Sequence, residues 1–373
     1  MYLHEYHSKR VLERFAIPTL PGRTATTAQE AGVIAAEFGV PVVVNAQSLS
    51  NIRVFRRAET PEEAETIAQE ILNMALAGVR VRLLLIEPAV ETITECFLGI
   101  FGNRGSNLII FTSTEAGNDL NQIEREHPGA LYRETIDPFL GVLEFQARNL
   151  ANSINLPRES WNDFTRIAKN LYRCAMASDA VRAEINPLGL LSDGRLIALG
   201  ARLVLDDNAL FRQPELAAMR DILAEHESAV QARASDISYI RLNGKTGCIV
   251  SGAGLGMATI DMLEERGASA SGFLDLGSDI HRDKVSAGLR LIMPNSETIL
   301  FNIFGDKAPC LDIAQELLAA IIETQPTVPL VIRLAGHEAH AAENLLKQAN
   351  LPNFATARST TEAVQQIVAA AKA

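Results

Sequence analysis

The second half of the chain alternates short apolar runs with longer amphipathic stretches. The apolar runs predict strands at 247–250, 272–275, 298–303, 329–334 and 354–357. The stretches between and after them predict helices at 255–266, 281–292, 309–323, 337–349 and 360–372. Strands and helices that alternate at this spacing form a parallel sheet covered by helices on both faces. The sequence therefore predicts a flavodoxin-like α/β domain.

The first part of the chain is less regular. Helices are predicted at 3–15 and 28–38, and strands at 40–44, 81–86, 95–101 and 107–111. A further helix begins at Thr60, a good N-cap, with Pro61 in the first turn and Glu63 completing a capping box. This mixed order predicts α+β lobes. The polar segment 226–238 is the linker candidate, so we expect domains at 1–235 and 236–373.

Composition excludes several classes of protein. Of the 373 residues, 47% are hydrophobic and 21% charged, which is ordinary for a soluble protein with substantial cores. The net charge of −11 argues against nucleic-acid and membrane-surface binding, because both partners are anionic. The N-terminus lacks the apolar region of a signal peptide, and we expect a cytoplasmic protein. The four cysteines each lie in apolar stretches, which predicts buried thiols.

Two short segments resemble functional motifs without fulfilling them. Gly244-Lys245-Thr246 lacks the earlier glycine of a P-loop, since Tyr239 takes that position. Asn243-Gly244 instead predicts a hairpin turn before a core strand. His337 and His340 are spaced i and i+3, whereas the zinc-protease motif needs i and i+4, so we expect a solvated helix terminus.

Other short motifs follow one another over almost the whole chain. They are LHEY at 3–6, STEAG at 113–117, AEINPL at 183–188, NALFRQP at 208–214, GAGL at 252–255, FLD at 273–275 and NIFG at 302–305. Together and in this order they resemble the β subunit of succinyl-CoA synthetase. The resemblance implies an ATP-grasp region first, with a lid-type lobe within about 21–100, and a flavodoxin-like CoA-ligase domain second.

The same resemblance implies a hetero-oligomer. An α-type subunit would bind CoA and carry the phosphorylated histidine, while this chain supplies the nucleotide site and part of the phosphohistidine site. A small carboxylate, CoA and ATP or GTP with Mg²⁺ would react through an acyl phosphate.

The resemblance also assigns site residues. Gly252, Ala253 and Gly254 open a helix whose unpaired N–H groups would bind the phosphoryl group, although a tight turn without a ligand has the same pattern. Glu184 would orient the phosphohistidine and Asn186 would bind magnesium, both in a sharp turn held by Pro187. Ordinary turn chemistry is the alternative.

The nucleotide site departs from the family pattern. Asn45 replaces a lysine, and the glycine-rich stretch is reduced to residues 48–53, with Arg53 as its one cation. Gly200 replaces a magnesium-binding aspartate, whereas Glu87 and Glu95 remain at nucleotide-side positions. Phosphates need cations and close backbone approach, and Mg²⁺ needs anionic oxygens, so these losses predict weak or absent nucleotide chemistry.

The acid-binding end is changed as well. Ser251 replaces an asparagine, and Gly305 is followed by Asp306, whose charge repels a carboxylate unless Lys307 or the partner balances it. We expect Ser251, Gly305 and Asp306 to border the acid. The leading hypothesis is an enzyme, the β-type subunit of an acid–CoA ligase; the alternative is a non-catalytic scaffold or regulatory subunit that keeps the α-binding surface.

Overall fold

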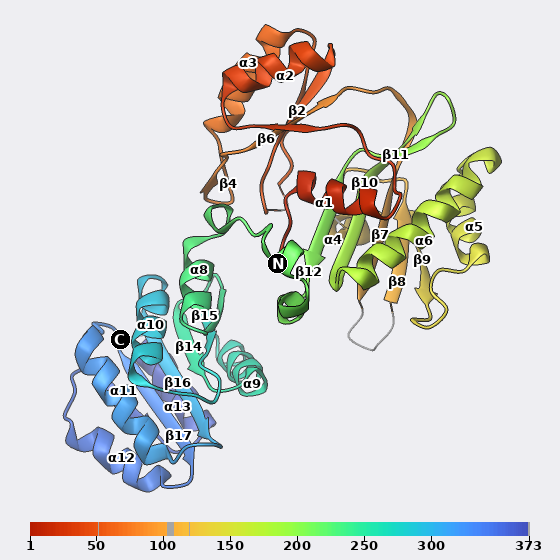
Figure 1. Ribbon diagram of the computed structural model, residues 1–373. Coiled ribbons are helices and arrows are strands. Elements are labelled where there is room, and N and C mark those ends of the chain that lie inside the picture. The colour runs from red at the N-terminus through yellow and green to blue at the C-terminus, as the bar shows by residue number, and fades with distance from the viewer. Residues whose placement is uncertain (51, 103–107, 119, 372–373) are drawn as a thin grey trace. The chain divides into compact units, whose positions relative to one another are not determined.

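The computed structural model describes residues 1–50, 52–102, 108–118 and 120–371, which form two compact units, Met1–Glu225 and His226–Ala373 (Figure 1). Each unit has hydrophobic cores of its own. The segment predicted as a linker contains helix α8 (Glu227–Ala234) and the start of strand β13 (Ser238–Arg241), and it lies in the second unit. The His226 side chain accepts the Ser228 N–H and so caps α8.

The first unit contains a small lobe, which is built on an antiparallel sheet in the order β1-β6-β2-β3. Its strands are β1 (Arg23–Ala25), β2 (Val42–Ala46), β3 (Phe55–Ala58) and β6 (Leu84–Pro88), and helices α2 (Ala28–Phe38) and α3 (Pro61–Leu72) pack on the sheet. A short hairpin, β4 (Ala75–Leu76) and β5 (Val79–Arg80), follows α3. Thr60 caps α3 as predicted, but the Glu63 carboxylate accepts the N–H of Glu59 rather than that of Thr60.

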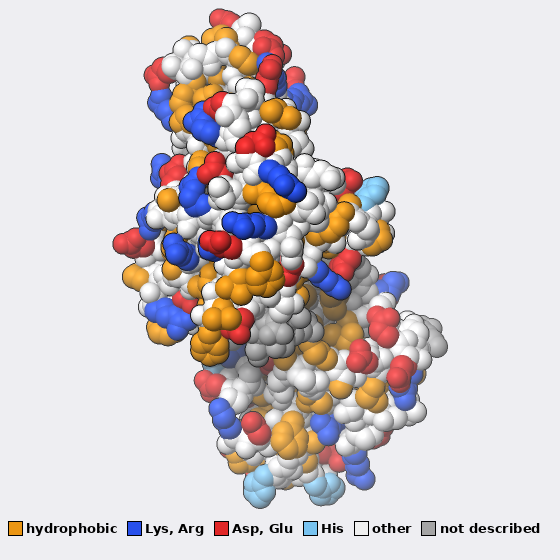
Figure 2. All heavy atoms as spheres, turned by 90° about the vertical axis from the view of Figure 1, so that its right-hand side faces the viewer, with side chains coloured by type: hydrophobic (Ala, Val, Ile, Leu, Met, Phe, Trp, Pro, Cys, Tyr) orange, Lys and Arg blue, Asp and Glu red, His pale blue; other side chains and the backbone are white. Residues whose placement is uncertain are grey.

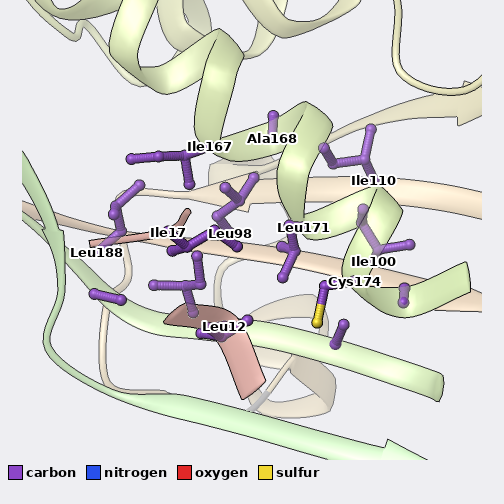
Figure 3. Close-up of a cluster of buried hydrophobic side chains, with 14 of the residues drawn as sticks. Leu12, Ile17, Leu98, Ile100, Ile110, Ile167, Ala168, Leu171, Cys174 and Leu188 are labelled. Atoms are coloured by element: carbon purple, nitrogen blue, oxygen red, sulfur yellow. The ribbon is translucent and has the colours of Figure 1, made fainter. Parts of the chain in front are cut away.

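The larger lobe is an antiparallel sheet in the order β11-β10-β7-β8-β9, with β12 also paired to β10. The strands are β7 (Thr92–Gly102), β8 (Leu108–Ser113), β9 (Leu131–Ile136), β10 (Ala180–Leu191), β11 (Leu196–Ala198) and β12 (Ala201–Leu205). The helices are α1 (Glu5–Arg14), α4 (Leu120–Glu126), α5 (Glu144–Ser153), α6 (Trp161–Ala177) and α7 (Pro214–Ala217). Figure 3 shows the core, where Leu171 and Cys174 of α6 lie against Leu98 and Ile100 of β7.

The predicted turn at Glu184 and Asn186 is wrong, because both residues lie inside β10. Ile185 pairs with Leu98 and Leu188 pairs with Cys96, so residues 186–187 face a single residue of β7. Such an extra residue is a β-bulge, which redirects the side chains around it. The bulge therefore gives the special geometry that the Asn–Pro sequence suggested, without ending the strand.

The second unit has the strand order β13-β15-β14-β16-β17-β18, in which β13 alone is antiparallel. The parallel strands are β14 (Thr246–Val250), β15 (Ala270–Asp275), β16 (Thr298–Gly305), β17 (Leu330–Gly336) and β18 (Phe354–Ala357). Helices α9 (Ala253–Glu264) and α13 (Thr360–Ala370) pack together, and α10 (Arg282–Ile292), α11 (Cys310–Thr324) and α12 (Ala339–Gln348) form the other layer. This is the flavodoxin order, and the predicted fold is confirmed.

Gly244 serves a different purpose from the predicted hairpin. β13 pairs with β15 and not with β14, so no hairpin joins the strands on either side of Gly244. A Cβ atom at this position would lie 2.2 Å from the carbonyl oxygen of Ser269. Glycine is needed there because two backbone segments meet closely.

The surface and the cysteines agree with the composition. All four cysteines are buried free thiols, as predicted. On the face shown in Figure 2, Lys and Arg side chains are interspersed with Asp and Glu. Within the described residues, no helix is long and apolar enough to cross a membrane.

The α6 core yields a stability prediction. Leu171 is fully buried, and Leu171→Ala is expected to lower the free energy of unfolding of the first unit by about 2–5 kcal/mol, because a cavity remains. The single tryptophan, Trp161, packs on this core, so its fluorescence during urea unfolding reports on the first unit. Met176→Ala on the same helix is the control, since Met176 is 47% exposed; a loss as large as that of Leu171→Ala would contradict the assignment.

Candidate functional site

A polar cleft in the first unit brings together residues of both lobes. Its lining includes four of the predicted site residues: Asn45, Arg53, Glu184 and Asn186. Asn45 lies at the end of β2, Arg53 follows that strand, and Glu184 and Asn186 belong to β10. The β10 bulge and the segment after β2 therefore form a single site.

A buried ionic network lies under one side of this cleft. The Lys9 Nζ atom is 2.6 and 2.7 Å from the two carboxylate oxygens of Glu87 and 3.2 Å from Glu5 Oε1. The other Glu5 oxygen accepts a 3.0 Å hydrogen bond from Asn45 Nδ2. Asn45, predicted at the nucleotide phosphates, thus has its amide directed to Glu5.

Burial dominates the electrostatics of Glu87. It raises the pKa of Glu87 to about 7, and the Glu5 charge adds to this effect, while Lys9 opposes it. Glu87 is only 4% exposed and is not part of the cleft lining. Both of its carboxylate oxygens accept hydrogen bonds from Lys9, and its role on the nucleotide side stays a prediction.

Arg53 connects the small lobe to the bulge. Its Nη1 donates a 2.6 Å hydrogen bond to the backbone oxygen of Asn186, and its Nη2 lies 3.8 Å from Glu5 Oε2. A Cβ atom at Gly200 would lie 2.7 Å from Arg53 Nη2 and 2.1 Å from the Asn186 oxygen. The space that an aspartate side chain would enter at residue 200 is therefore filled by backbone and guanidinium.

The Asn186 side chain is held by the segment that follows β8. Its Oδ1 accepts a 2.6 Å hydrogen bond from the Gly117 N–H, and its Nδ2 donates a 2.9 Å bond to the Asn118 oxygen. Both ends of the amide are thus used to fix this segment on β10. Gly200 has no side chain, and the Asn186 side-chain oxygen already accepts a hydrogen bond. The residues present therefore do not offer the oxygen ligands needed by the Mg²⁺ that the sequence resemblance implies. Among the described residues there is also no group of three or more His, Cys, Asp or Glu fit to hold a metal.

Glu184 is buried, with 3% of its surface exposed, and lies beside Arg182 on the same face of β10. The Arg182 Nε and Nη2 atoms are 2.6 and 2.5 Å from Glu184 Oε1. Arg182 also stacks over the Phe101 ring at 4.9 Å. This fork holds the carboxylate in one orientation and balances its charge.

Glu95 lies elsewhere. It is exposed on β7, pairs with Gly189 of β10, and accepts a 3.1 Å hydrogen bond from Thr92. It does not belong to the cleft lining, so the structure separates it from Asn45 and Arg53.

The predicted residues of the second unit meet at the carboxyl edge of its sheet. β14 lies between β15 and β16, and the strand order reverses there, which is where ligands bind in open α/β sheets. Ser251 follows β14; its Oγ donates to the Phe304 oxygen at 3.1 Å and accepts the Phe304 N–H at 2.9 Å. Ser251 thus ties β14 to β16 at the switch point.

Helix α9 opens at this switch point. Gly252 has φ +101°, which favours glycine, and its N–H donates to Asp275 Oδ1 at 2.7 Å. The first intrahelical bond runs from Gly256 N–H to the Gly252 oxygen, so the N–H groups of Ala253, Gly254 and Leu255 precede it. Ala253 and Gly254 are exposed, and this end of the helix is accessible to an anion.

Gly305 and Asp306 lie at the neighbouring strand end. A Cβ atom at Gly305 would be 2.8 Å from the Ala308 oxygen, which explains the glycine, and Asp306 is exposed on the following turn. His337 and His340, which lie at the start of α12, are exposed.

Three residues that hold the predicted site residues in place were not predicted from the sequence: Lys9, Arg182 and Asp275. Arg182 could have been found from its i, i+2 spacing to Glu184, once the segment was recognised as a strand. Asp275 ends a predicted strand beside the Gly252 turn, a placement typical of this fold. The only local signal for Lys9 was its i, i+4 spacing to Glu5, because its other partner, Glu87, is 78 positions away.

Known proteins define the class of this chain. The sequence profile of the ATP-grasp domain matches residues 2–190, and that of the CoA-ligase family matches residues 249–369. The solved structure of ATP citrate lyase from Methanothrix soehngenii in complex with citrate and coenzyme A matches 99% of each chain with a TM-score of 0.71. At 15% identity this likeness shows the fold alone. The chain is therefore an ATP-grasp domain joined to a CoA-ligase domain.

Sequence relatives narrow the class to a family. The succinate–CoA ligase [ADP-forming] subunit beta of Chloroflexus aurantiacus is 40% identical over 100% of this chain and 99% of its own length. The subunit of the same description from Myxococcus xanthus is 36% identical, and both chains are covered completely. The chain belongs to the family of succinate–CoA ligase β subunits.

The raised pKa of Glu87 predicts a pH dependence. Protonation of Glu87 favours the folded state, so its contribution is full below pH about 4.5 and is lost as the pH rises through about 7. The Glu87→Gln variant removes this titration, and Lys9 still has Glu5 as its charged partner. Between pH 5 and 7.5 the free energy of unfolding of the wild type should therefore fall by about 1–3 kcal/mol relative to Glu87→Gln.

Urea titrations followed by Trp161 fluorescence measure this difference. The exposed Glu95→Gln variant is the control and should run parallel to the wild type. A constant difference between wild type and Glu87→Gln across this pH range would exclude the raised pKa.

Proposed function

We propose that the chain is the β-type subunit of an acid–CoA ligase that works with an α-type partner. The observation that supports this most directly is the full-length relationship to succinate–CoA ligase β subunits, and the exposed residues Ala253 and Gly254 at the opening of α9 agree with it. Succinate is the acid in the relatives' names, and the changed residues Ser251 and Asp306 leave open which small carboxylic acid this chain uses.

The proposed chemistry of the second unit is phosphoryl and acyl transfer. A carboxylate oxygen of the acid attacks the phosphorus of the partner's phosphohistidine; the N–P bond breaks and an acyl phosphate forms. The thiol of CoA, bound by the partner, then attacks the carbonyl and releases phosphate. The N–H groups that open α9, at Ala253 and Gly254, bind the phosphoryl oxygens, and the helix dipole favours the negative charge.

The other site residues have supporting roles in this proposal. Ser251, Gly305 and Asp306 border the acid, and Asp275 fixes the Gly252 turn through its two backbone hydrogen bonds. In the first unit, Glu184 orients the imidazole of the phosphohistidine, held ready by Arg182. ATP or GTP is the family's phosphoryl source, whereas here Asn45 contacts Glu5, Glu87 contacts Lys9, and Glu95 lies outside the cleft lining.

A second candidate, a non-catalytic scaffold, rests on one observation. The nucleotide-side residues of the first unit make contacts with each other: Asn45 with Glu5, Arg53 with Asn186, and Glu87 with Lys9. A scaffold would keep the partner-binding surface of the second unit without the transfer.

Labelling of the partner's histidine tests the proposal without nucleotide. The chain is purified with an α-type subunit from the same genome and mixed with succinyl-CoA and radiolabelled phosphate, which run the proposed steps backwards. We expect a labelled α subunit. Ala253→Glu should reduce the rate at least about 100-fold, because a carboxylate would occupy the phosphoryl site.

Two further variants sharpen the test. His340→Glu introduces the same charge in the first turn of α12 and should label normally. Glu184→Gln should lower the steady amount of phosphohistidine. A complex that forms but labels with neither succinyl-CoA nor the CoA thioesters of other small carboxylic acids would replace the enzyme with the scaffold. A chain that forms no complex would overturn both.

A further inference from the structure

The positive charge beside the bulge of β10 is a protein side chain, Arg53. Arg53 reaches from the small lobe to the Asn186 oxygen at 2.6 Å, beside the place where residue 200 has no side chain. The acceptors that a divalent metal would need here are already used: the Asn186 Oδ1 takes the Gly117 N–H and the Asn186 backbone oxygen takes Arg53. A metal ion would have to break both hydrogen bonds and displace a positive charge.

The charges of the lining favour an anion. Arg53, Arg182 and Arg202 line the cleft against the carboxylates of Glu5 and Glu184. Arg182 is matched to Glu184 at 2.5 Å, whereas the nearest approach of Arg53 to Glu5 is 3.8 Å, and Glu5 also serves Lys9 and Asn45. The positive charge of Arg53 is therefore compensated less completely.

Arg53 also has donors to offer. A guanidinium has five N–H groups. Among the described residues, the Arg53 guanidinium donates a hydrogen bond to one acceptor, the Asn186 oxygen. Its side chain is 25% exposed and stacks at 5.8 Å on the ring of Phe55, which restricts its orientation. A planar donor held in this way matches the oxygen spacing of a phosphate.

From this geometry we infer that Arg53 is the fixed cation of the cleft, which binds a phosphate-class anion without a divalent metal. The inference rests on the proposed function, which brings the partner's phosphohistidine to Glu184 in the lining of the same cleft. The phosphate could be free or the terminal group of a nucleotide, since both present the same oxygens. Arg53 is a binding residue here, and Arg202, 3.4 Å from the Ser50 oxygen, lies on the same side of the cleft.

Calorimetric titration of the isolated chain with inorganic phosphate tests the inference, in EDTA and again in excess Mg²⁺ at equal ionic strength. We expect the dissociation constant to agree within about twofold between the two conditions. Arg53→Gln should weaken binding about tenfold or more, the cost of losing a charge-assisted hydrogen bond. Arg53→Lys keeps the charge, and its affinity for phosphate should lie between those of the wild type and Arg53→Gln.

Arg57→Gln is the matched control, because Arg57 is an exposed arginine of the neighbouring strand β3, paired with Glu59. It should bind phosphate like the wild type, and urea unfolding followed by Trp161 fluorescence verifies that each variant is folded. Repeating the titration with ATP in EDTA distinguishes the sources: binding much tighter than phosphate indicates a nucleotide terminus, and equal binding indicates free phosphate.

Three results would overturn the inference: binding that appears only with Mg²⁺, binding that Arg53→Gln leaves unchanged, or no binding of either probe. The α subunit takes no part in this experiment. If the chain supports labelling of the partner's histidine but does not bind phosphate in the titration, only the role of Arg53 is refuted. If the chain binds phosphate but does not support labelling, only the proposed function is refuted.

Discussion

Lys9, buried between the carboxylates of Glu87 and Glu5, is the interaction on which the first unit depends. A buried charge is tolerated only when it is paired, and removal of one partner typically costs about 3–5 kcal/mol. Lys9 and Glu5 are one turn apart on α1, while Glu87 lies on β6 of the small lobe. The ion pair therefore fixes the small lobe to α1. Through Glu5 it also sets the position of Asn45 and Arg53, and so determines which groups face the cleft.

The second unit depends on a different constraint, the reversal of strand order beside β14. The reversal brings the ends of β14, β15 and β16 together without help from distant charges. Ser251 and Asp275 fix the local backbone by hydrogen bonds to main-chain groups of Phe304, Gly252 and Gly277. A site made largely of backbone N–H groups tolerates substitution of side chains nearby. This explains how the residues proposed to border the acid can change while the opening of α9 is kept.

The two units differ in how far the sequence could predict them. In the second unit each helix packs on a neighbouring strand, so local periodicity was sufficient, and the predicted helix 281–292 differs from α10 by a single residue at its start. In the first unit β10 was not recognised, because Asn186-Pro187 suggested a turn and the bulge is visible only through pairing with β7. The contacts of the cleft join residues far apart, with 133 positions between Arg53 and Asn186. Local spacing has no information about such pairs.

The departures from the family pattern become one coordinated change in the structure. Asn45 has its amide on Glu5, an interaction that a lysine would also satisfy, but with a charge competing for the carboxylate that Lys9 already uses. Gly200 lets the Asn186 oxygen and the Arg53 guanidinium approach to distances that any side chain at residue 200 would prevent. The glycine at residue 200 and the contact of Arg53 with the Asn186 oxygen thus depend on each other. The fit between Gly200, Asn186 and Arg53 therefore places a protein cation where the family pattern has a magnesium-binding aspartate.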